Sequence, residues 1–127
     1  MHTMPTKQTI FPVLPQYEHL DVNELVNRLD HDSPQVRASA LAALGNKAGE
    51  QSLGTMIKAI KEERNRKAPW FGFITVSWVG VVSLLQSGDG QAQKLAREIV
   101  SEWDPDEKQH LISWLKDFPA YAQALTS

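Results

Sequence analysis

The sequence predicts an all-α protein, and three observations support this fold class. Apolar residues recur at helical spacing along most of the chain, and acidic residues or Ser-Pro and Asp-Pro steps stand where helices would begin. No turn of the Asn-Gly type separates alternating apolar and polar residues, so we expect essentially no β-sheet. The length of 127 residues suits one helical domain over residues 21–127, preceded by an extended leader over residues 1–20.

The leader is interrupted by Pro5, Pro12 and Pro15 and has no continuous apolar run, so we do not expect a signal peptide. The absence of cysteine gives secretion no support, and we expect a cytoplasmic protein. The leader also carries apolar residues that could dock on the helical domain: Ile10, Phe11, Val13, Leu14 and Tyr17.

The first two helices are predicted over residues 21–30 and 34–45. In the first, Asp21 and Glu24 form a capping box ahead of an apolar stripe. The second begins at the Ser33-Pro34 step, because proline is favoured in the first helical position. Its apolar stripe consists of Val36, Ala40, Leu41, Ala43 and Leu44.

Three further helices are predicted over residues 51–63, 90–103 and 105–118. The first two have one continuous apolar face each, and the third begins at a cap formed by Asp104 and Pro105. Their apolar faces comprise Leu53, Met56, Ile57 and Ile60; Ala92, Leu95, Ala96, Ile99, Val100 and Trp103; and Leu111, Trp114, Leu115 and Phe118.

Residues 69–86 are rich in β-branched side chains, which favours strands. The segment is nevertheless long for a strand, and Ile74, Trp78, Val81 and Leu85 share one helical face. We therefore predict a helix buried on most sides. With Trp78 in its core, it would be the central helix of the domain.

These helices pair into three antiparallel hairpins, whose second helices begin at Pro34, Pro69 and Pro105, 35 and 36 residues apart. A stack of three hairpins would form a short α-solenoid or a compact bundle, followed by a short C-terminal helix. The middle hairpin would be covered on both sides, which would explain why residues 69–86 have no polar face.

The segment from Leu29 to Gly45 has the pattern L-x-x-D-x-x-x-V-R-x-x-A-x-x-A-L-G. This pattern resembles the HEAT-like repeat of the phycobilin-lyase (PBS lyase) type, with one clear repeat and two degenerate ones. The resemblance implies a right-handed solenoid used for binding, in which Arg37 ties its helix to Asp30 or Asp32. Proteins with such repeats include bilin lyase subunits and scaffolds, and fold analogy does not choose among them.

A basic run with aromatic residues directly after it is the most promising charged surface: Lys58, Lys61, Arg64, Arg66 and Lys67, followed by Trp70 and Phe71. Phosphate binding with base stacking is one interpretation. However, Glu62 and Glu63 interrupt the run, and basic residues suit a helix C-terminus, so we expect no nucleic acid partner.

The sequence gives no reason to expect catalysis, a cofactor or a metal. Glu107 and His110 have the spacing of a di-iron motif, but the chain has no second Glu-x-x-His. The segment Asp30-His31-Asp32-Ser33 contains the residue types of a catalytic triad, but neighbours within one turn cannot converge as nucleophile, base and orienting group.

Residues 68–88 contain no charged residue and follow a basic flank, which is the crude pattern of a membrane span. Gly, Ser, Thr and Pro dilute its apolarity, and Trp78 would lie near the bilayer centre, so we favour a buried helix over a membrane-tethered protein.

Our first hypothesis is a non-catalytic protein-protein interaction module or scaffold. Its partner and oligomeric state are not specified by the sequence. The candidate contact residues are Arg37, Arg66, Lys67 and Trp70. The alternative is a bilin lyase or pigment-handling subunit, in which Arg66 and Lys67 would bind propionates and Trp70 would contact the pigment rings.

Overall fold

The computed structural model describes residues 9–47 and 50–126 and is mostly helical within them, as predicted. No helix in these two ranges has the length and apolarity needed to cross a bilayer. The elements follow in this order: a 3-10 turn (Pro15–Tyr17), α1 (Val22–Arg28), α2 (Pro34–Asn46), α3 (Glu50–Lys61), α4 (Glu63–Lys67), β1 (Pro69–Phe71), β2 (Ile74–Thr75), α5 (Val76–Gln86), α6 (Gly90–Ser101), α7 (Pro105–Trp114) and α8 (Pro119–Thr126).

The predicted helix starts of α1, α2 and α7 are confirmed. Asp21 and Glu24 form the expected reciprocal capping box at α1, which satisfies two backbone N–H groups. Ser33 caps α2 and Asp104 caps α7, each directly ahead of a proline in the first turn. Local capping chemistry therefore fixes where these three helices begin.

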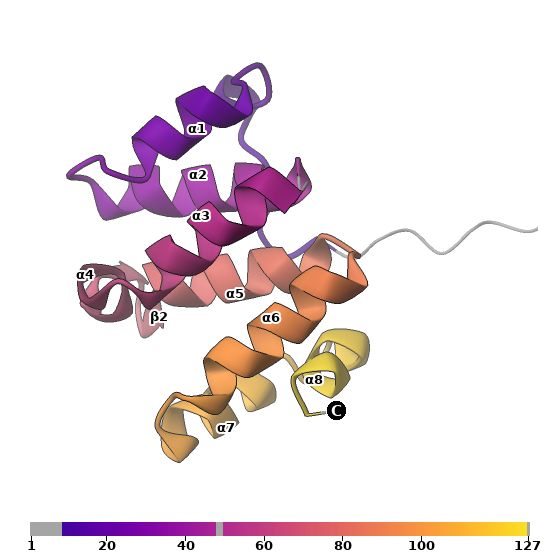
Figure 1. The fold of residues 1–127 in the computed structure, drawn as a ribbon. Coiled ribbons are helices and arrows are strands. Elements are labelled where there is room, and N and C mark those ends of the chain that lie inside the picture. The colour runs from indigo at the N-terminus through magenta and orange to yellow at the C-terminus, as the bar shows by residue number, and fades with distance from the viewer. Residues whose placement is uncertain (1–8, 48–49, 127) are drawn as a thin grey trace, which may run out of the picture.

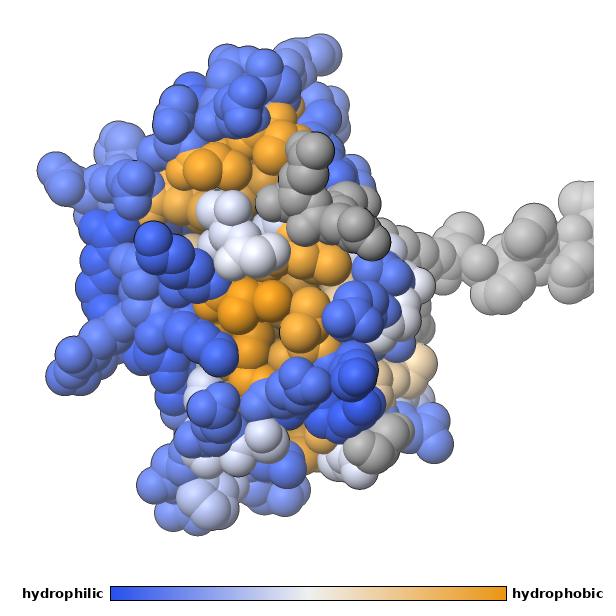
Figure 2. Space-filling model, in the orientation of Figure 1, coloured by the Kyte–Doolittle hydropathy of each residue, from blue (hydrophilic) through white to orange (hydrophobic). Residues whose placement is uncertain are grey.

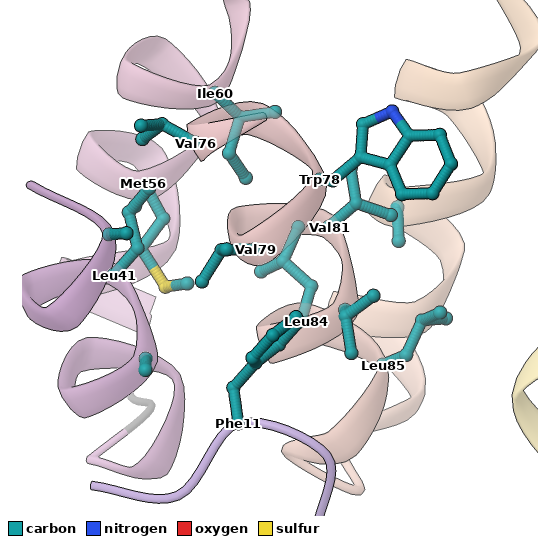
Figure 3. Packing of buried hydrophobic residues seen from close by; sticks show 14 of the residues in the cluster. Phe11, Leu41, Met56, Ile60, Val76, Trp78, Val79, Val81, Leu84 and Leu85 are labelled. Carbon is teal, nitrogen blue, oxygen red and sulfur yellow. The ribbon is translucent and has the colours of Figure 1, made fainter. Parts of the chain in front are cut away.

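Helix α5 is the centre of the core, and all of its residues are buried. It lies between α2 and α3 on one side and α6 and α8 on the other (Figure 1). Its side chains point in both directions: Val79 faces Leu41 and Met56, whereas Trp78 and Leu85 point to the opposite side (Figure 3). Burial on every side explains why this helix has no polar face.

Helices α2 and α5 approach each other closely where Gly45 faces Ser83. A Cβ atom on Gly45 would lie 2.8 Å from the Ser83 carbonyl oxygen. On α5, a Cβ atom on Gly80 would overlap the side chain of Ile60 from α3. Glycine is therefore required at both positions by packing, and the two contacts fix how closely α2 and α3 can approach α5.

The prediction of a helix across residues 69–86 is wrong over residues 69–75, where the chain forms one small two-stranded sheet in an otherwise helical fold. Residues 69–75 form an antiparallel β-hairpin, which we call the aromatic hairpin, and α5 begins only at Val76. Gly72 turns the chain with a φ of 56°, which is strained for residues with a side chain, and Thr75 caps α5 through Trp78 N. The local turn and cap outweigh the helical periodicity of this segment.

Two other boundaries also differ from the predicted ranges. The helix expected over 51–63 ends at Lys61, because Glu62 has an extended backbone with a ψ of 132°. Only the last three cations of the basic run lie in the separate short helix α4. The helix expected over 105–118 ends at Trp114. Residues 119–126 form α8, the short C-terminal helix.

One face of the molecule has an apolar band bordered by polar residues (Figure 2). It lies on the side of α1, α3 and α6 that faces the viewer in Figure 1. Half-buried apolar side chains of these helices are Val22, Val26, Ile57 and Leu95.

Candidate functional site

The basic run that the sequence analysis singled out is largely neutralised by ion pairs. Four of its five cations pair with carboxylates: Lys61 with Glu102, Arg64 with Asp30 and Glu62, Arg66 with Glu107, and Lys67 with Glu63. The pairing leaves less unbalanced positive charge for a phosphate backbone than the sequence alone suggests.

Arg37 is only 4% exposed and holds three chain segments together. Its Nε donates to Asn65 Oδ1 at 2.7 Å, and its Nη1 donates to the carbonyl oxygens of His31 and Asp32 at 2.8 and 2.9 Å. The expected tie to the preceding turn is therefore made to main-chain carbonyls instead of an Asp carboxylate. Burial lowers the pKa of Arg37, and the nearby charge of Arg64 lowers it further. Its position is structural, and it is not accessible as a surface contact.

Arg66 belongs to a cluster that joins four parts of the chain. It makes a bidentate ion pair with Glu107 on α7, and its guanidinium lies 3.9 Å from the centre of the Trp103 ring. Trp78 Nε1 also donates to Glu107, at 2.9 Å. Burial alone would raise the pKa of Glu107, but hydrogen bonds from Arg66 and Trp78 and the charge of Arg66 bring it below its ordinary value. Arg66 is therefore committed to an internal contact.

Lys67 is 76% exposed and pairs with Glu63 one helical turn earlier, at 2.8 Å. The hydrogen bond and charge of Glu63 raise the pKa of Lys67. Exposed pairs of this kind contribute little to stability. Lys67 therefore remains open to solvent.

A pocket with a volume of about 490 Å³ is lined almost entirely by apolar side chains. We call it the apolar pocket. It is built from the leader, α2, the aromatic hairpin, α5 and α7. Its walls are Ile10, Phe11, Pro12, Leu14, Ala38, Ser39, Ala42, Trp70, Phe71, Ile74, Val79 and Trp114. A concave apolar site of this size is typical of a binding site for an apolar group.

The aromatic hairpin presents two phenylalanines to solvent, and one of them, Phe71, lines this pocket. Phe71 is 72% exposed and Phe73 is 53% exposed. Phe73 is held in place because its ring stacks on His110 at 4.4 Å and meets Trp78 edge-on at 5.5 Å. Phe71 adjoins Trp70, with ring centres 6.2 Å apart. The exposed rings are thus carried by a hairpin that is itself anchored to the core.

Trp70, the fourth predicted contact residue, is half-buried and forms part of the pocket wall. Its ring meets Phe11 edge-on at 5.2 Å, and Phe11 stacks against Trp114 at 6.0 Å. Of the four residues predicted from the sequence, Trp70 alone lines the apolar pocket. Trp103 is buried as expected, whereas Trp114 is only partly buried and faces the pocket.

Phe71, named from the sequence only as a neighbour of the basic run, and Phe73 were not among the four predicted contact residues, because both fell inside a predicted buried helix. The signal that could have found them is the run Trp70-Phe71-Gly72-Phe73, in which a glycine between aromatic residues indicates a turn that exposes them. From the sequence, Phe11 was expected only to dock on the helical domain. In the structure it forms one wall of the pocket together with Ile10, Pro12 and Leu14. Residues 1–8 of the predicted leader lie outside the described residues.

Across residues 9–47 and 50–126 no group of three or more His, Asp or Glu side chains is arranged to hold a metal ion. Glu107 and His110, the pair considered for a metal motif, instead contact Arg66 and Phe73 respectively.

Comparisons of the chain with protein-family models, with curated proteins and with solved structures gave no significant match.

Proposed function

We propose that this chain is a non-catalytic protein-binding module and that its contact surface consists of the aromatic hairpin and the apolar pocket. The observation that carries the proposal is the exposure of Phe71 in the wall of a largely apolar pocket, with Phe73 also exposed on the same hairpin. Contiguous apolar surface of this kind marks sites that are covered by a partner. The partner segment would place an apolar side chain in the pocket and pack against the two rings.

The rigidity of the hairpin supports this role. Phe73 rests on Trp78 and His110, and Trp70 rests on Phe11, so these rings lose little conformational freedom when a partner binds. Aromatic residues next to pockets are the residues that most often dominate binding energy at protein interfaces. The ion pairs of Arg64 and Arg66 favour an apolar contact over a charged one at this surface.

The repeat architecture is part of the same proposal. We infer that α1 with α2 and α3 with α5 are the first two hairpins of a short HEAT-like stack in the cytoplasm, with α6 and α7 forming the third. The 35-residue spacing between Pro34 and Pro69 supports a repeat, although Pro69 begins a strand and no helix. A binding surface that includes second helices of successive hairpins would fit the use of such repeats as scaffolds.

The pigment-binding alternative has weaker support. It requires Arg66 and Lys67 beside Trp70 to bind propionate groups. The described lining of the apolar pocket contains Trp70 but neither of the two cations, and Arg66 is already paired with Glu107. A bilin would therefore enter the pocket without partners for its charged groups.

Affinity capture with matched variants tests the proposal. The immobilised protein, Phe71→Ser and Lys67→Ser would be compared in extracts of the organism that makes the protein. Both residues are highly exposed, so neither change should alter folding. We expect Phe71→Ser to capture at least about 90% less of a partner than the wild type does. This loss corresponds to a binding free energy weakened by more than about 1.4 kcal/mol, as for an important interface residue. Lys67→Ser should retain it. Capture of the same proteins in the same amounts by Phe71→Ser would refute the proposal.

A further inference from the structure

The side chain of Gln86 forms three hydrogen bonds with the main chain of the leader. Gln86 lies in the last turn of α5 and is 6% exposed. Its Oε1 accepts hydrogen bonds from the N–H groups of Ile10 and Phe11 at 3.0 and 3.2 Å, and its Nε2 donates to the Phe11 carbonyl oxygen at 2.7 Å. These three bonds involve only backbone groups of the leader, so they would form equally with the backbone of another extended segment.

Beside these hydrogen bonds, the ring of Phe11 fills an aromatic slot formed by Trp70 and Trp114. It lies edge-on to Trp70 and stacks on Trp114, and it is 7% exposed. It reaches α5 next to Leu84 (Figure 3). We call Gln86, Trp70 and Trp114 the Phe11 seat. The seat therefore accommodates an aromatic side chain and forms hydrogen bonds with three backbone groups of two consecutive residues.

Pro12, the residue after Phe11, favours an extended backbone at Phe11. Pro12 has no N–H group to satisfy, and proline restricts the preceding residue to extended conformations. Beyond it, Leu14 is 40% exposed, and the next deeply buried anchor is Tyr17. The segment between the seat and Tyr17 is thus anchored at its two ends and is half-buried or exposed between them. Release of the Phe11 end would break the three Gln86 hydrogen bonds and the ring contacts with Trp70 and Trp114.

We propose that the Phe11 seat is an exchangeable peptide-binding site, filled by the chain's own leader and open to competition from a partner. The competing ligand is an extended protein segment with an aromatic residue followed by proline, the chemistry of the resident segment. This inference rests on the proposed function and specifies the partner's binding element. Because Ile10, Phe11, Pro12 and Leu14 also line the apolar pocket, their displacement would lengthen the groove open to that partner.

Tethering sets the expected strength of competition. A segment attached by a short linker acts at a millimolar effective concentration, so a free peptide with the same contacts binds the wild-type chain weakly. Phe11→Ala empties the aromatic slot and weakens the tethered competitor, which keeps only its backbone hydrogen bonds to Gln86. We therefore expect the free peptide of residues 9–14 to bind Phe11→Ala at least about tenfold more tightly than it binds the wild-type chain.

The first measurement follows tryptophan fluorescence of the full-length chain during titration with this peptide. Phe11→Ala should show saturable binding, and the same peptide with alanine in place of its phenylalanine should not bind. Adding Gln86→Met to Phe11→Ala should abolish the gain, because methionine keeps the volume of glutamine without its hydrogen bonds. No saturable binding by folded Phe11→Ala up to about 10 mM peptide, above the tethered concentration, would overturn the inference.

A second measurement keeps Phe11 in place and does not depend on the stability of Phe11→Ala. The chain has no cysteine, so Thr9→Cys, at an exposed position, can carry a single bimane label. Tryptophan quenches bimane on contact, and Trp70 and Trp114 contact Phe11, two residues from the label. The peptide should raise the label's fluorescence as it displaces the leader, and the alanine peptide should not. An unchanged signal up to about 10 mM peptide would contradict an exchangeable seat. Failure here with loss of partner capture by Phe71→Ser would leave the proposed function standing and remove only this inference.

Discussion

Arg66 on α4 binds Glu107 on α7 through two hydrogen bonds, with Nη1 to Oε2 at 3.2 Å and Nη2 to Oε1 at 2.5 Å. The two side chains are only 24% and 27% exposed, so water screens the pair less than it screens surface pairs. Trp78 of α5 donates to the same carboxylate. The Glu107 carboxylate therefore ties α4, α5 and α7 together behind the aromatic hairpin.

This pair predicts a pH-dependent contribution to stability. The pKa of Glu107 lies below its ordinary value of 4.5, so its stabilising effect is present above that value and is lost as the pH falls through the lowered pKa. Glu107→Gln should lower the free energy of unfolding by about 1.5–3 kcal/mol near neutral pH, the range for hydrogen bonds to charged groups. The difference from wild type should shrink at acid pH. Denaturant unfolding across this range measures both.

Glu63→Gln is the matched control for the same experiment, because it breaks an exposed pair with Lys67. Its effect at neutral pH should be smaller than that of Glu107→Gln. Equal effects of the two changes, or a Glu107→Gln effect that does not vary with pH, would contradict the role assigned to this cluster.

The packing of α3 on α5 predicts opposite outcomes for two glycine substitutions. Gly80→Ala would drive a methyl group into Ile60 and should destabilise the protein by about 1–3 kcal/mol, the usual cost of overpacking. Gly54 is exposed on α3 with no neighbour within 4 Å of a new Cβ atom, so Gly54→Ala should stabilise by about 0.5–1 kcal/mol. Thermal unfolding of both variants checks the sign. Stabilisation by Gly80→Ala would refute the close packing of these helices.

Trp78 links the core to the Glu107 cluster, and two substitutions separate these contributions. Trp78 is 2% exposed, so Trp78→Ala should leave a large cavity and cost about 3–5 kcal/mol. Trp78→Phe keeps an aromatic ring but removes the hydrogen bond to Glu107, and it should cost less. Denaturant unfolding gives both values. A Trp78→Ala variant as stable as the wild type would contradict the placement of α5 at the centre of the core.

Arg37 should affect stability without affecting partner binding. Arg37→Met leaves Asn65 Oδ1 and two carbonyl oxygens without their charged donor, and should cost at least about 1.5 kcal/mol. Asn65→Ala breaks the same contact from the other side, so the double variant should lose less stability than the sum of the two. At a temperature where Arg37→Met is folded, partner capture should equal that of wild type. Selective loss of the partner would place Arg37 at the interface instead.

The sequence was sufficient to predict the helical class and the starts of α1, α2 and α7, because these depend on local caps and on apolar spacing. It was insufficient for residues 69–75, where the periodicity of a buried helix and the turn preference of Gly72 compete within one segment. The roles of Arg37 and Arg66 depend on Asn65 and Glu107, which only the three-dimensional fold brings to them. Trp70 lies in the pocket wall at the segment boundary where the sequence indicated an edge aromatic, whereas the wrong helix boundary hid the exposure of Phe71 and Phe73.

The most direct test of the proposed binding surface is site-specific photo-crosslinking from the hairpin in extracts of the organism that makes the protein. A benzoyl-phenylalanine in place of Phe71 keeps an aromatic group at the exposed rim, and the same residue in place of Asn23, exposed on α1, is the control. We predict a defined protein adduct at position 71 that is absent at position 23 and is the protein that Phe71→Ser fails to capture. Adducts that are identical at both positions, or no adduct at position 71 while a partner still co-purifies, would contradict the account.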